Sequence, residues 1–445
     1  MYHEKENIDA DLSKMSFDIK SLGKPIYLSP IQSVNFVKDN DRIIYNTNYE
    51  ELLNQLSKDK NSIITFEKAG PRERIYFEPS KSVAGIVTCG GLCPGLNNVI
   101  RSIVMQLFYQ YRVKDIIGIR YGYKGLNLDQ KISPLRLNPD VVQDIHNLGG
   151  SILGSSRGYS DAVKIVDALE YYGINILFTI GGDGTIRGAI KIVEEIEKRD
   201  LKISVIGIPK TIDNDIPFIS KTFGFETAFS EAVEAIRCAH AEAKGAPNGI
   251  GIVKVMGRDS GFIAAQASLA QKDVNYVLIP EIDFDLEGPK GLFKNIEERL
   301  KKRGHALIVI AEGSGQKYFE GAEAKYDASG NKVLNDIGVY LKNKLKQYFD
   351  KINMEVNIKY IDPSYIIRSV PASPNDSVYC GFLAENAVHA AMAGKTKMII
   401  GKWNENFVHL PMEIVNLGRK KIDIKGSLWR SVILSTGQED FINDK

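Results

Sequence analysis

The sequence has few cysteines, no long hydrophobic run and almost no excess charge of either sign. Its 4 cysteines in 445 residues are too few for a disulfide framework. No run of about 20 apolar residues is present, which is the length needed to cross a bilayer. Because 57 basic residues nearly balance 55 acidic ones, composition gives no electrostatic case for binding nucleic acid or an anionic membrane. The amino terminus also lacks the apolar core of a signal peptide, so we expect a cytoplasmic protein.

The remaining composition is that of a globular protein, with 44% hydrophobic and 25% charged residues. At roughly 150 residues per domain, the length favours two or three domains. Residues 1–80 are polar and irregular and predict an extension or a small appended domain. Residues 418–445 are charged and predict a surface tail, in which the segment 418–425 is a solvated face.

Between these ends, short β-branched runs alternate with amphipathic helical segments, which is the pattern of an α/β protein with a mostly parallel sheet. The predicted buried strands are 83–88, 116–119, 176–180, 203–208, 250–255, 276–279, 306–311 and 398–401. The predicted helices include 98–109, 227–243 and 377–393.

Two glycine-rich loops follow predicted strands and precede helices. The first, TCGGLCPGLN at 88–97, has glycines that let backbone N–H groups approach a phosphate, although a simple tight turn explains it equally well. The second, TIGGDGT at 179–185, carries Asp183 within the loop. A carboxylate there repels phosphate unless a cation lies between them, so this loop predicts a magnesium-bound nucleotide.

A third segment, PKTIDND at 209–215, places Asp213 and Asp215 at the carboxyl end of a predicted strand, where open α/β sheets bind ligands. A general base for phosphoryl transfer must accept a hydroxyl proton while the attacking oxygen lines up with the phosphorus. Asp213 suits this role, with Thr211 and Lys210 beside the transferred group. The alternative is an Asx-rich turn that caps the next helix.

Taken in order, the motifs TCGGLCPGLN, GSSRG, GGDGT, PKTIDND, VMGRDSGFIA, IPE and AEG resemble those of the phosphofructokinase family between Val83 and Gly401. The resemblance is greatest to the long branch that includes pyrophosphate-dependent enzymes and trypanosomatid ATP-dependent enzymes. It implies two Rossmann-like lobes with a cleft between them, a homotetramer under allosteric control, and phosphorylation of fructose 6-phosphate at its 1-hydroxyl. The donor-binding lobe is then 81–224 with 377–420, the sugar-phosphate lobe is 225–376, and 421–445 is a carboxyl-terminal tail.

The family's functional residues carry over to matching positions. The resemblance implies that Asp213, Arg157 and Thr211 are catalytic and that Asp183 serves the magnesium ion. It implies donor contacts from Gly91, Tyr123, Arg157, Gly182, Asp183, Gly184, Thr185 and Lys210. It implies sugar-phosphate contacts from Thr211, Asp213, Asp215, Met256, Gly257, Arg258, Glu312, Tyr365 and Arg368.

Two positions bear on the choice of donor, and each favours a different one. Similar pyrophosphate-dependent enzymes carry Asp at the position of Gly184, where that side chain blocks the α-phosphate of ATP. Lys210 is typical of the pyrophosphate-dependent enzymes, but a flexible lysine can swing aside. We therefore predict ATP as the donor and keep a pyrophosphate-dependent phosphotransferase as the alternative.

Two further groups of positions depart from the pattern of the short bacterial enzymes. Gly249 and Ser377 replace arginines of the phosphate pocket, which predicts a different pocket that uses Lys254. Met105 replaces an effector-binding arginine while Arg101 is retained, which weakens the case for an effector at that site.

Two other functions compete with this one. NAD and lipid kinases also use a GGDGT loop, but the segments PKTIDND and VMGR argue against them. A non-catalytic sugar-phosphate sensor is disfavoured because Asp183, Asp213 and Arg258 are all present.

Overall fold

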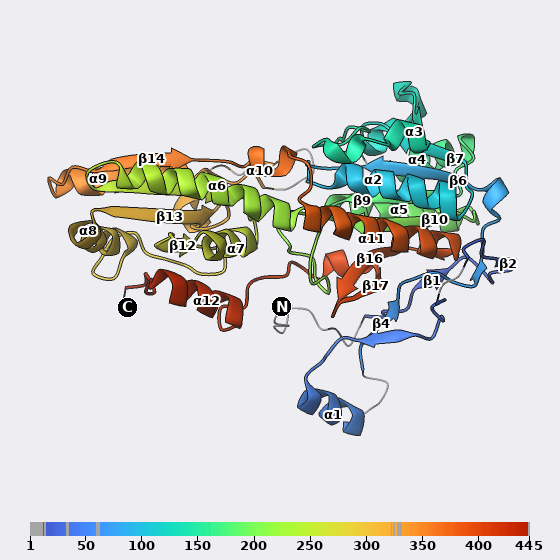
Figure 1. The fold of residues 1–445 in the computed structure, drawn as a ribbon, viewed down its shortest axis with the longest axis horizontal. Coiled ribbons are helices and arrows are strands. Elements are labelled where there is room, and N and C mark those ends of the chain that lie inside the picture. The colour runs from blue at the N-terminus through green and yellow to red at the C-terminus, as the bar shows by residue number, and fades with distance from the viewer. Residues whose placement is uncertain are drawn as a thin grey trace.

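The computed structural model describes residues 12, 15–32, 35–58, 63–159, 161–321, 323, 325–326 and 332–443. In this part of the chain, two large sheets lie side by side along the length of the molecule (Figure 1). The predicted α/β fold with two mostly parallel lobes is confirmed. All of the predicted strands are present, with small shifts at their ends.

The larger sheet has nine strands, and its five central strands are parallel. Its order is β3 (Arg42–Ile44), β4 (Thr65–Lys68), β17 (Asn406–Pro411), β16 (Met398–Trp403), β10 (Ser204–Pro209), β9 (Ile176–Gly181), β6 (Val83–Thr88), β7 (Asp115–Ile119) and β8 (Leu135–Arg136). The central strands β9 and β10 are buried along their whole length because helices cover both faces of the sheet.

The helices α2 (Leu96–Met105) and α11 (Pro374–Met392) pack together on one side of this sheet. The helices α4 (Ala162–Tyr171) and α5 (Asp183–Lys198) pack on the other, and α3 (Pro139–Val142) lies beside α2. The helix predicted over 98–109 ends at Met105 and continues as a π-helical turn, Gln106–Gln110.

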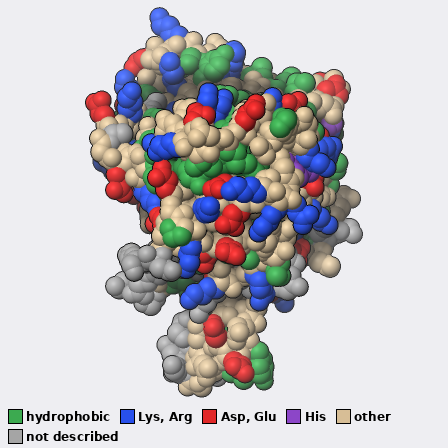
Figure 2. All heavy atoms as spheres, turned by 90° about the vertical axis from the view of Figure 1, so that its left-hand side faces the viewer, with side chains coloured by type: hydrophobic (Ala, Val, Ile, Leu, Met, Phe, Trp, Pro, Cys, Tyr) green, Lys and Arg blue, Asp and Glu red, His purple; other side chains and the backbone are tan. Residues whose placement is uncertain are grey.

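The smaller sheet is parallel throughout, in the order β12 (Tyr276–Leu278), β13 (His305–Ala311), β11 (Gly249–Val255) and β14 (Asn357–Ile361). One face is covered by α6 (Phe225–Lys244) and α7 (Phe262–Gln271), and the other by α8 (Leu292–Arg303) and α9 (Ile337–Lys351). The short helix α10 (Ile366–Ser369) packs against α6. Figure 2 shows this end of the molecule, where basic and acidic side chains are interspersed.

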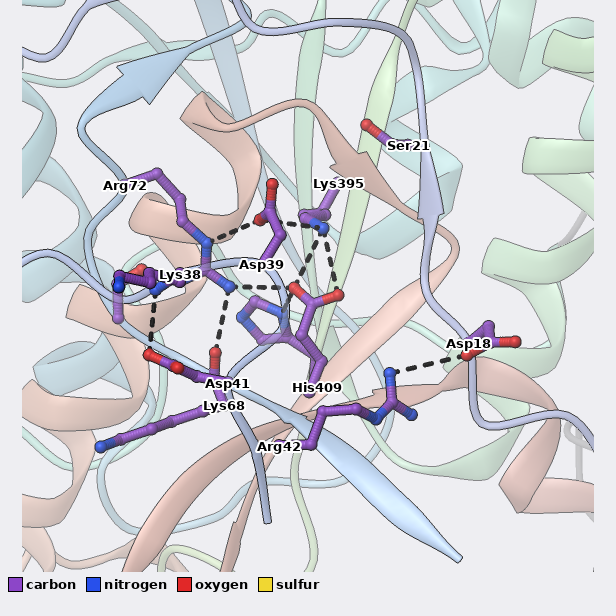
Figure 3. A network of polar contacts seen from close by, with 12 residues as sticks. Asp18, Ser21, Lys38, Asp39, Asp41, Arg42, Lys68, Arg72, Lys395 and His409 are labelled. Atoms are coloured by element: carbon purple, nitrogen blue, oxygen red, sulfur yellow. Dashed lines mark hydrogen bonds and ion pairs between the residues drawn. The ribbon is translucent and has the colours of Figure 1, made fainter. Parts of the chain in front are cut away.

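The described part of the first 80 residues is joined to the larger sheet by strand pairing. Strands β3 and β4 extend it through β17, and two small antiparallel sheets join β1 (Lys20–Ser21) to β15 (Lys395–Thr396) and β2 (Tyr27–Leu28) to β5 (Arg74–Ile75). The helix α1 (Tyr49–Lys58) projects from this region (Figure 1). The joint contains a buried charged network (Figure 3) in which Glu67 accepts hydrogen bonds from Arg72, Lys395 and His409.

The prediction of a solvated, tail-like segment after residue 418 is wrong. Ile422 is buried, and the helix α12 (Ser427–Thr436) packs its buried Trp429 and Val432 toward α7 and β12. Gln438 is also buried, and its side chain pairs with both backbone groups of Val277 on the edge strand β12. In α12, apolar residues recur at helical spacing within an otherwise charged segment, so the helix has an apolar face that packs against the smaller lobe.

Among the described residues, no helix is both long enough and apolar enough to cross a bilayer.

Candidate functional site

A single cavity of about 690 Å³ lies where the carboxyl ends of strands from both sheets meet. The loops after β6, β9 and β10 enter it from the larger sheet, and those after β11, β13 and β14 enter it from the smaller one. This is the edge at which open parallel sheets bind ligands. Every site residue predicted from the sequence lines the cavity except Gly257.

Three cations surround the first glycine loop. The Lys210 ammonium donates a hydrogen bond to the Gly91 carbonyl. A Cβ atom added to Gly91 would lie 3.2 Å from Arg157 Nη2 and 3.4 Å from Arg368 Nη1. Burial, followed by the nearby charges of Arg157 and Arg368, lowers the pKa of Lys210. This concentration of positive charge around exposed backbone is suited to phosphate oxygens.

The second glycine loop opens helix α5, with Gly182 at its amino-terminal cap and Asp183 in its first turn. Burial raises the pKa of Asp183, while Arg419 opposes the rise. A Cβ atom added to Gly184 would meet nothing within 4 Å, so this position faces open space. Tyr123 stabilises this loop, because its hydroxyl donates a hydrogen bond to the Thr185 carbonyl at 2.9 Å.

Asp213 and Asp215 lie on one tight loop but have different surroundings. Thr211 Oγ1 donates to Asp215 Oδ1 at 3.2 Å and accepts the Asp213 backbone N–H at 3.0 Å. Asp213 Oδ1 is buried without a hydrogen-bond partner in the described residues. Burial and the charges of Asp215 and Glu312 raise the pKa of Asp213 well above its usual range. A carboxylate of this kind is a suitable proton acceptor.

The loops of the smaller sheet contribute Met256, Arg258 and Glu312 to the opposite wall. The Arg258 guanidinium donates a hydrogen bond to the Lys332 carbonyl. Gly257 instead serves the turn: its φ is +129°, and an added Cβ would lie 2.6 Å from the Ser260 carbonyl oxygen.

Tyr365 and Arg368 also line the cavity and form a pair, with the guanidinium carbon 4.8 Å from the ring centroid. The Lys254 ammonium lies 2.9 Å from Asp336 and 2.8 Å from Asp362. Lys254 lines the cavity, as expected, but its charge is already balanced by these two carboxylates.

The two other departures lie outside the cavity. A Cβ atom at Gly249 would lie 1.9 Å from the Ala243 carbonyl oxygen, so the packing of β11 against α6 excludes any side chain there. Ser377 Oγ accepts a hydrogen bond from Asn98 and links α11 to α2. Arg101 and Met105 line a separate cavity of about 340 Å³ between the same two helices.

Sequence reasoning missed Arg419, which it assigned to a solvated face. Its guanidinium enters the cavity and lies 2.8 Å from Asp183 and 3.0 Å from Asp215. Nothing local in the sequence marks Arg419 as different from its basic neighbours, because its partners come from two other loops.

The residues fit a magnesium ion only if the ion brings other ligands with it. In the part of the chain that the structure describes, no group of three or more His, Cys, Asp or Glu side chains is arranged to hold a metal ion. Asp183 nevertheless holds the positive guanidinium of Arg419 at 2.8 Å, so its carboxylate is directed at a cation. Phosphate oxygens and water would complete the shell of a magnesium ion bound there.

Comparison with known proteins adds sequence evidence to this geometry. Residues 83–391 match the family model described as "Phosphofructokinase". An ATP-dependent 6-phosphofructokinase from Borreliella burgdorferi is 52% identical over 98% of this chain and 99% of its own length. Enzymes of the same name from Amycolatopsis methanolica and Trypanosoma cruzi are 45% and 48% identical, over 94% and 82% of this chain and 94% and 75% of their own lengths.

Solved structures share the fold at lower identity. A pyrophosphate-dependent phosphofructokinase from Marinobacter aquaeolei superposes with a TM-score of 0.65 at 20% identity, covering 81% of this chain and 92% of its own. At this identity the likeness supports the fold and gives no information on the donor.

Proposed function

Because the chain belongs to the phosphofructokinase family, we propose that it transfers the γ-phosphoryl group of ATP to the 1-hydroxyl of fructose 6-phosphate. The products are ADP and fructose 1,6-bisphosphate. The relatives with which it shares 45–52% identity over nearly their whole length are named as ATP-dependent enzymes. The pyrophosphate-dependent alternative has less support.

In this proposal Asp213 accepts the proton of the 1-hydroxyl as the sugar oxygen bonds to the γ-phosphorus and the bond to ADP breaks. Its buried, unpartnered Oδ1 and raised pKa support this role. Thr211 holds Asp215 and the Asp213 backbone in place. Arg157, beside Gly91, stabilises the charge of the transferring group.

The other predicted residues divide between the two substrates. Donor contacts come from Gly91, Tyr123, Gly182, Asp183, Gly184, Thr185 and Lys210. Sugar-phosphate contacts come from Met256, Arg258, Glu312, Tyr365 and Arg368. Gly257 shapes the turn that presents its neighbours. A magnesium ion held by Asp183 would neutralise charge on the donor phosphates.

The open space at Gly184 is the observation that carries the choice of donor, since a larger donor needs room there. The test measures bisphosphate formation by the purified protein with fructose 6-phosphate, Mg²⁺ and either ATP or pyrophosphate. We expect turnover with ATP. Turnover with pyrophosphate alone would reverse the assignment.

Substituting Gly184 tests whether the open space at this position is what admits ATP. Gly184→Asp should fit the fold, but its carboxylate would enter the donor space and repel the phosphates. We expect kcat/KM for ATP to fall about 100-fold or more, with little change in melting temperature. Gly184→Ala, which adds a methyl group and no charge, is the matched control and should remain close to wild type. Equal effects of the two substitutions would refute this account.

We also propose the cellular compartment, the oligomeric state and the lobe boundaries that the family resemblance implies. These are a cytoplasmic homotetramer, a donor-binding lobe of 81–224 with 377–420, and a sugar-phosphate lobe of 225–376. Membership of the larger and smaller sheets supports this division. Allosteric control at the cavity beside Arg101 is less supported, because that guanidinium donates to the Gln143 carbonyl and Met105 offers no charge.

A further inference from the structure

The segment that carries Arg419 is fixed by contacts of the residues that follow it in the chain. The Lys420 backbone N–H donates to the Asp215 carbonyl at 2.8 Å, and the Lys420 ammonium donates to the Ile219 carbonyl. The Ile422 backbone N–H donates to the buried Glu281 carboxylate at 2.9 Å. These contacts hold the chain against the loop after β10 and the segment after β12, so the direction of Arg419 into the cavity is set by the fold.

The Arg419 guanidinium joins carboxylates from separate loops. Its Nη2 lies 2.8 Å from Asp183 Oδ2, its Nη1 lies 3.0 Å from Asp215 Oδ2, and its Nε lies 3.9 Å from Asp259 Oδ2. Asp183 and Asp215 are 9% and 2% exposed. Two buried carboxylates facing one cavity need a nearby positive charge, and Arg419 supplies it.

The same oxygen of Asp183 cannot serve Arg419 and a divalent ion equally well. Magnesium binds carboxylate oxygens at about 2.0–2.1 Å. A metal ion at Oδ2 would therefore lie against the guanidinium, and two positive centres would repel each other. Asp215 and Asp259 offer the arginine two other carboxylates within reach.

We propose that Arg419 is a placeholder cation, which balances Asp183 before the donor binds and gives up that carboxylate to the donor's metal ion while keeping Asp215. This inference rests on the proposed function of Asp183 as the magnesium residue. In this proposal, residues 418–422 hold Arg419 where it compensates the negative charge of the donor site between turnovers.

The test measures binding of Mn²⁺, a paramagnetic substitute for Mg²⁺, to the protein without any nucleotide, using electron paramagnetic resonance. The wild-type protein should bind Mn²⁺ weakly because Arg419 competes for Asp183. Arg419→Ala should bind it about tenfold more tightly or better, since this substitution removes the competing charge. Arg187→Ala is the matched control: Arg187 lies 3.9 Å from the same carboxylate but is half exposed, so a much smaller change is expected.

A second readout follows the folded state. Arg419→Ala should melt at a lower temperature than wild type without metal, because Asp183 and Asp215 are left unbalanced, and Mg²⁺ should restore much of the loss. If Arg419→Ala does not fold, Arg419→Lys keeps one charge but cannot bridge two carboxylates, and its Mn²⁺ affinity should still exceed that of wild type.

Two outcomes would overturn the inference, and they are distinguishable. Unchanged Mn²⁺ affinity in folded Arg419 variants, together with loss of binding in Asp183→Asn, would refute the placeholder and leave the metal role of Asp183 intact. Unchanged affinity on adding Asp183→Asn to Arg419→Ala would refute the metal role itself. Neither result depends on which phosphoryl donor the enzyme uses.

Discussion

Asp213 and Asp215 show how neighbouring residues of one type acquire different chemistry from their surroundings. Asp215 accepts a hydrogen bond from Thr211 and forms an ion pair with Arg419. Asp213 has one buried oxygen without a partner in the described residues, and the adjacent charge of Asp215 disfavours its ionisation. The two carboxylates therefore differ: Asp215 is held by two partners, and Asp213 has the surroundings expected of the proposed proton acceptor.

This difference predicts the pH dependence of the reaction. Asp213 must be ionised to accept a proton, and its pKa is raised, so activity should fall as pH decreases through a value well above the usual 3.9 or so of an aspartate. Asp215→Asn removes a neighbouring charge that raises this pKa, so the acid limb of kcat/KM should move to lower pH. Asp213→Asn should lower kcat about 100-fold to 10,000-fold at every pH.

The measurement is kcat/KM for fructose 6-phosphate across the acid range at saturating donor. Asp259→Asn is the control, because Asp259 also faces Arg419 but is not among the groups that shift Asp213. An acid limb that stays in place in Asp215→Asn would contradict the assignment of Asp213 as the base.

Single residues differ in how far the sequence predicts them. Asp213 and Gly184 lie in short motifs whose chemistry is readable locally, directly after apolar strands. The position of Arg419 in the site depends on contacts between loops that are far apart in the sequence. Its own segment has the composition of an ordinary charged surface. Lys254 was predicted to reach the cavity, but its neutralisation by Asp336 and Asp362 depends on the packing of distant strands.

At the level of elements, the central parallel strands were predictable because burial on both faces requires continuous apolar runs. Strands β4 and β17, towards one end of the larger sheet, and β14, at the edge of the smaller sheet, were not, since their exposed or half-buried residues include charged and polar side chains. Strands outside the buried centre of a sheet need less hydrophobicity, and the pairs β4–β17 and β11–β14 join segments that lie far apart in the sequence. The polar first 80 residues therefore gave no indication that β3 and β4 lengthen the larger sheet.

The joint between β4 and β17 predicts a specific stability effect. Burial alone would raise the pKa of Glu67, but hydrogen bonds and charges from His409 and Lys395 lower it to about 2 from 4.5. Since the folded pKa lies below the unfolded one, the stabilisation is present above about pH 5 and is lost as pH falls towards 2. Glu67→Gln should reduce the free energy of unfolding at pH 7 by about 3 kcal/mol.

Denaturant unfolding at pH 7 and pH 4 measures this effect. The loss caused by Glu67→Gln should be smaller at pH 4, where wild type has already lost part of the contribution. Asp39→Asn is the matched control, because Asp39 contacts the same Arg72 and Lys395 but is mostly exposed and should change stability little. Equal losses in the two variants would show that burial of Glu67 is unimportant.

At the scale of the molecule, the site exists because two sheets present their carboxyl ends to one cavity. The larger sheet supplies the glycine loops and Asp213, and the smaller sheet supplies Arg258 and Glu312. Arg419 lines the same cavity, and it lies on the segment that runs from the larger sheet to α12, whose ribbon Figure 1 shows. Each half alone would hold an incomplete set of charges, so the reaction requires both.

The face formed by α2 and α11 predicts how copies of the chain assemble. Tyr109, Val378 and Phe382 expose apolar side chains around the smaller cavity between these helices. Such a patch favours burial against another subunit, which supports the proposed homotetramer. A charge placed in its middle should therefore separate subunits without disturbing the core of either sheet.

Val378→Glu is the suitable change, because Val378 is 60% exposed. Burying the new carboxylate in an interface costs several kcal/mol, so light scattering at micromolar concentration should report a smaller particle than wild type. Val163→Glu makes the same change on α4, where Val163 is 49% exposed, and should keep the wild-type mass. If Val378→Glu also keeps that mass, the subunits meet elsewhere, and the apolar face of α2 and α11 is not the contact that holds them together.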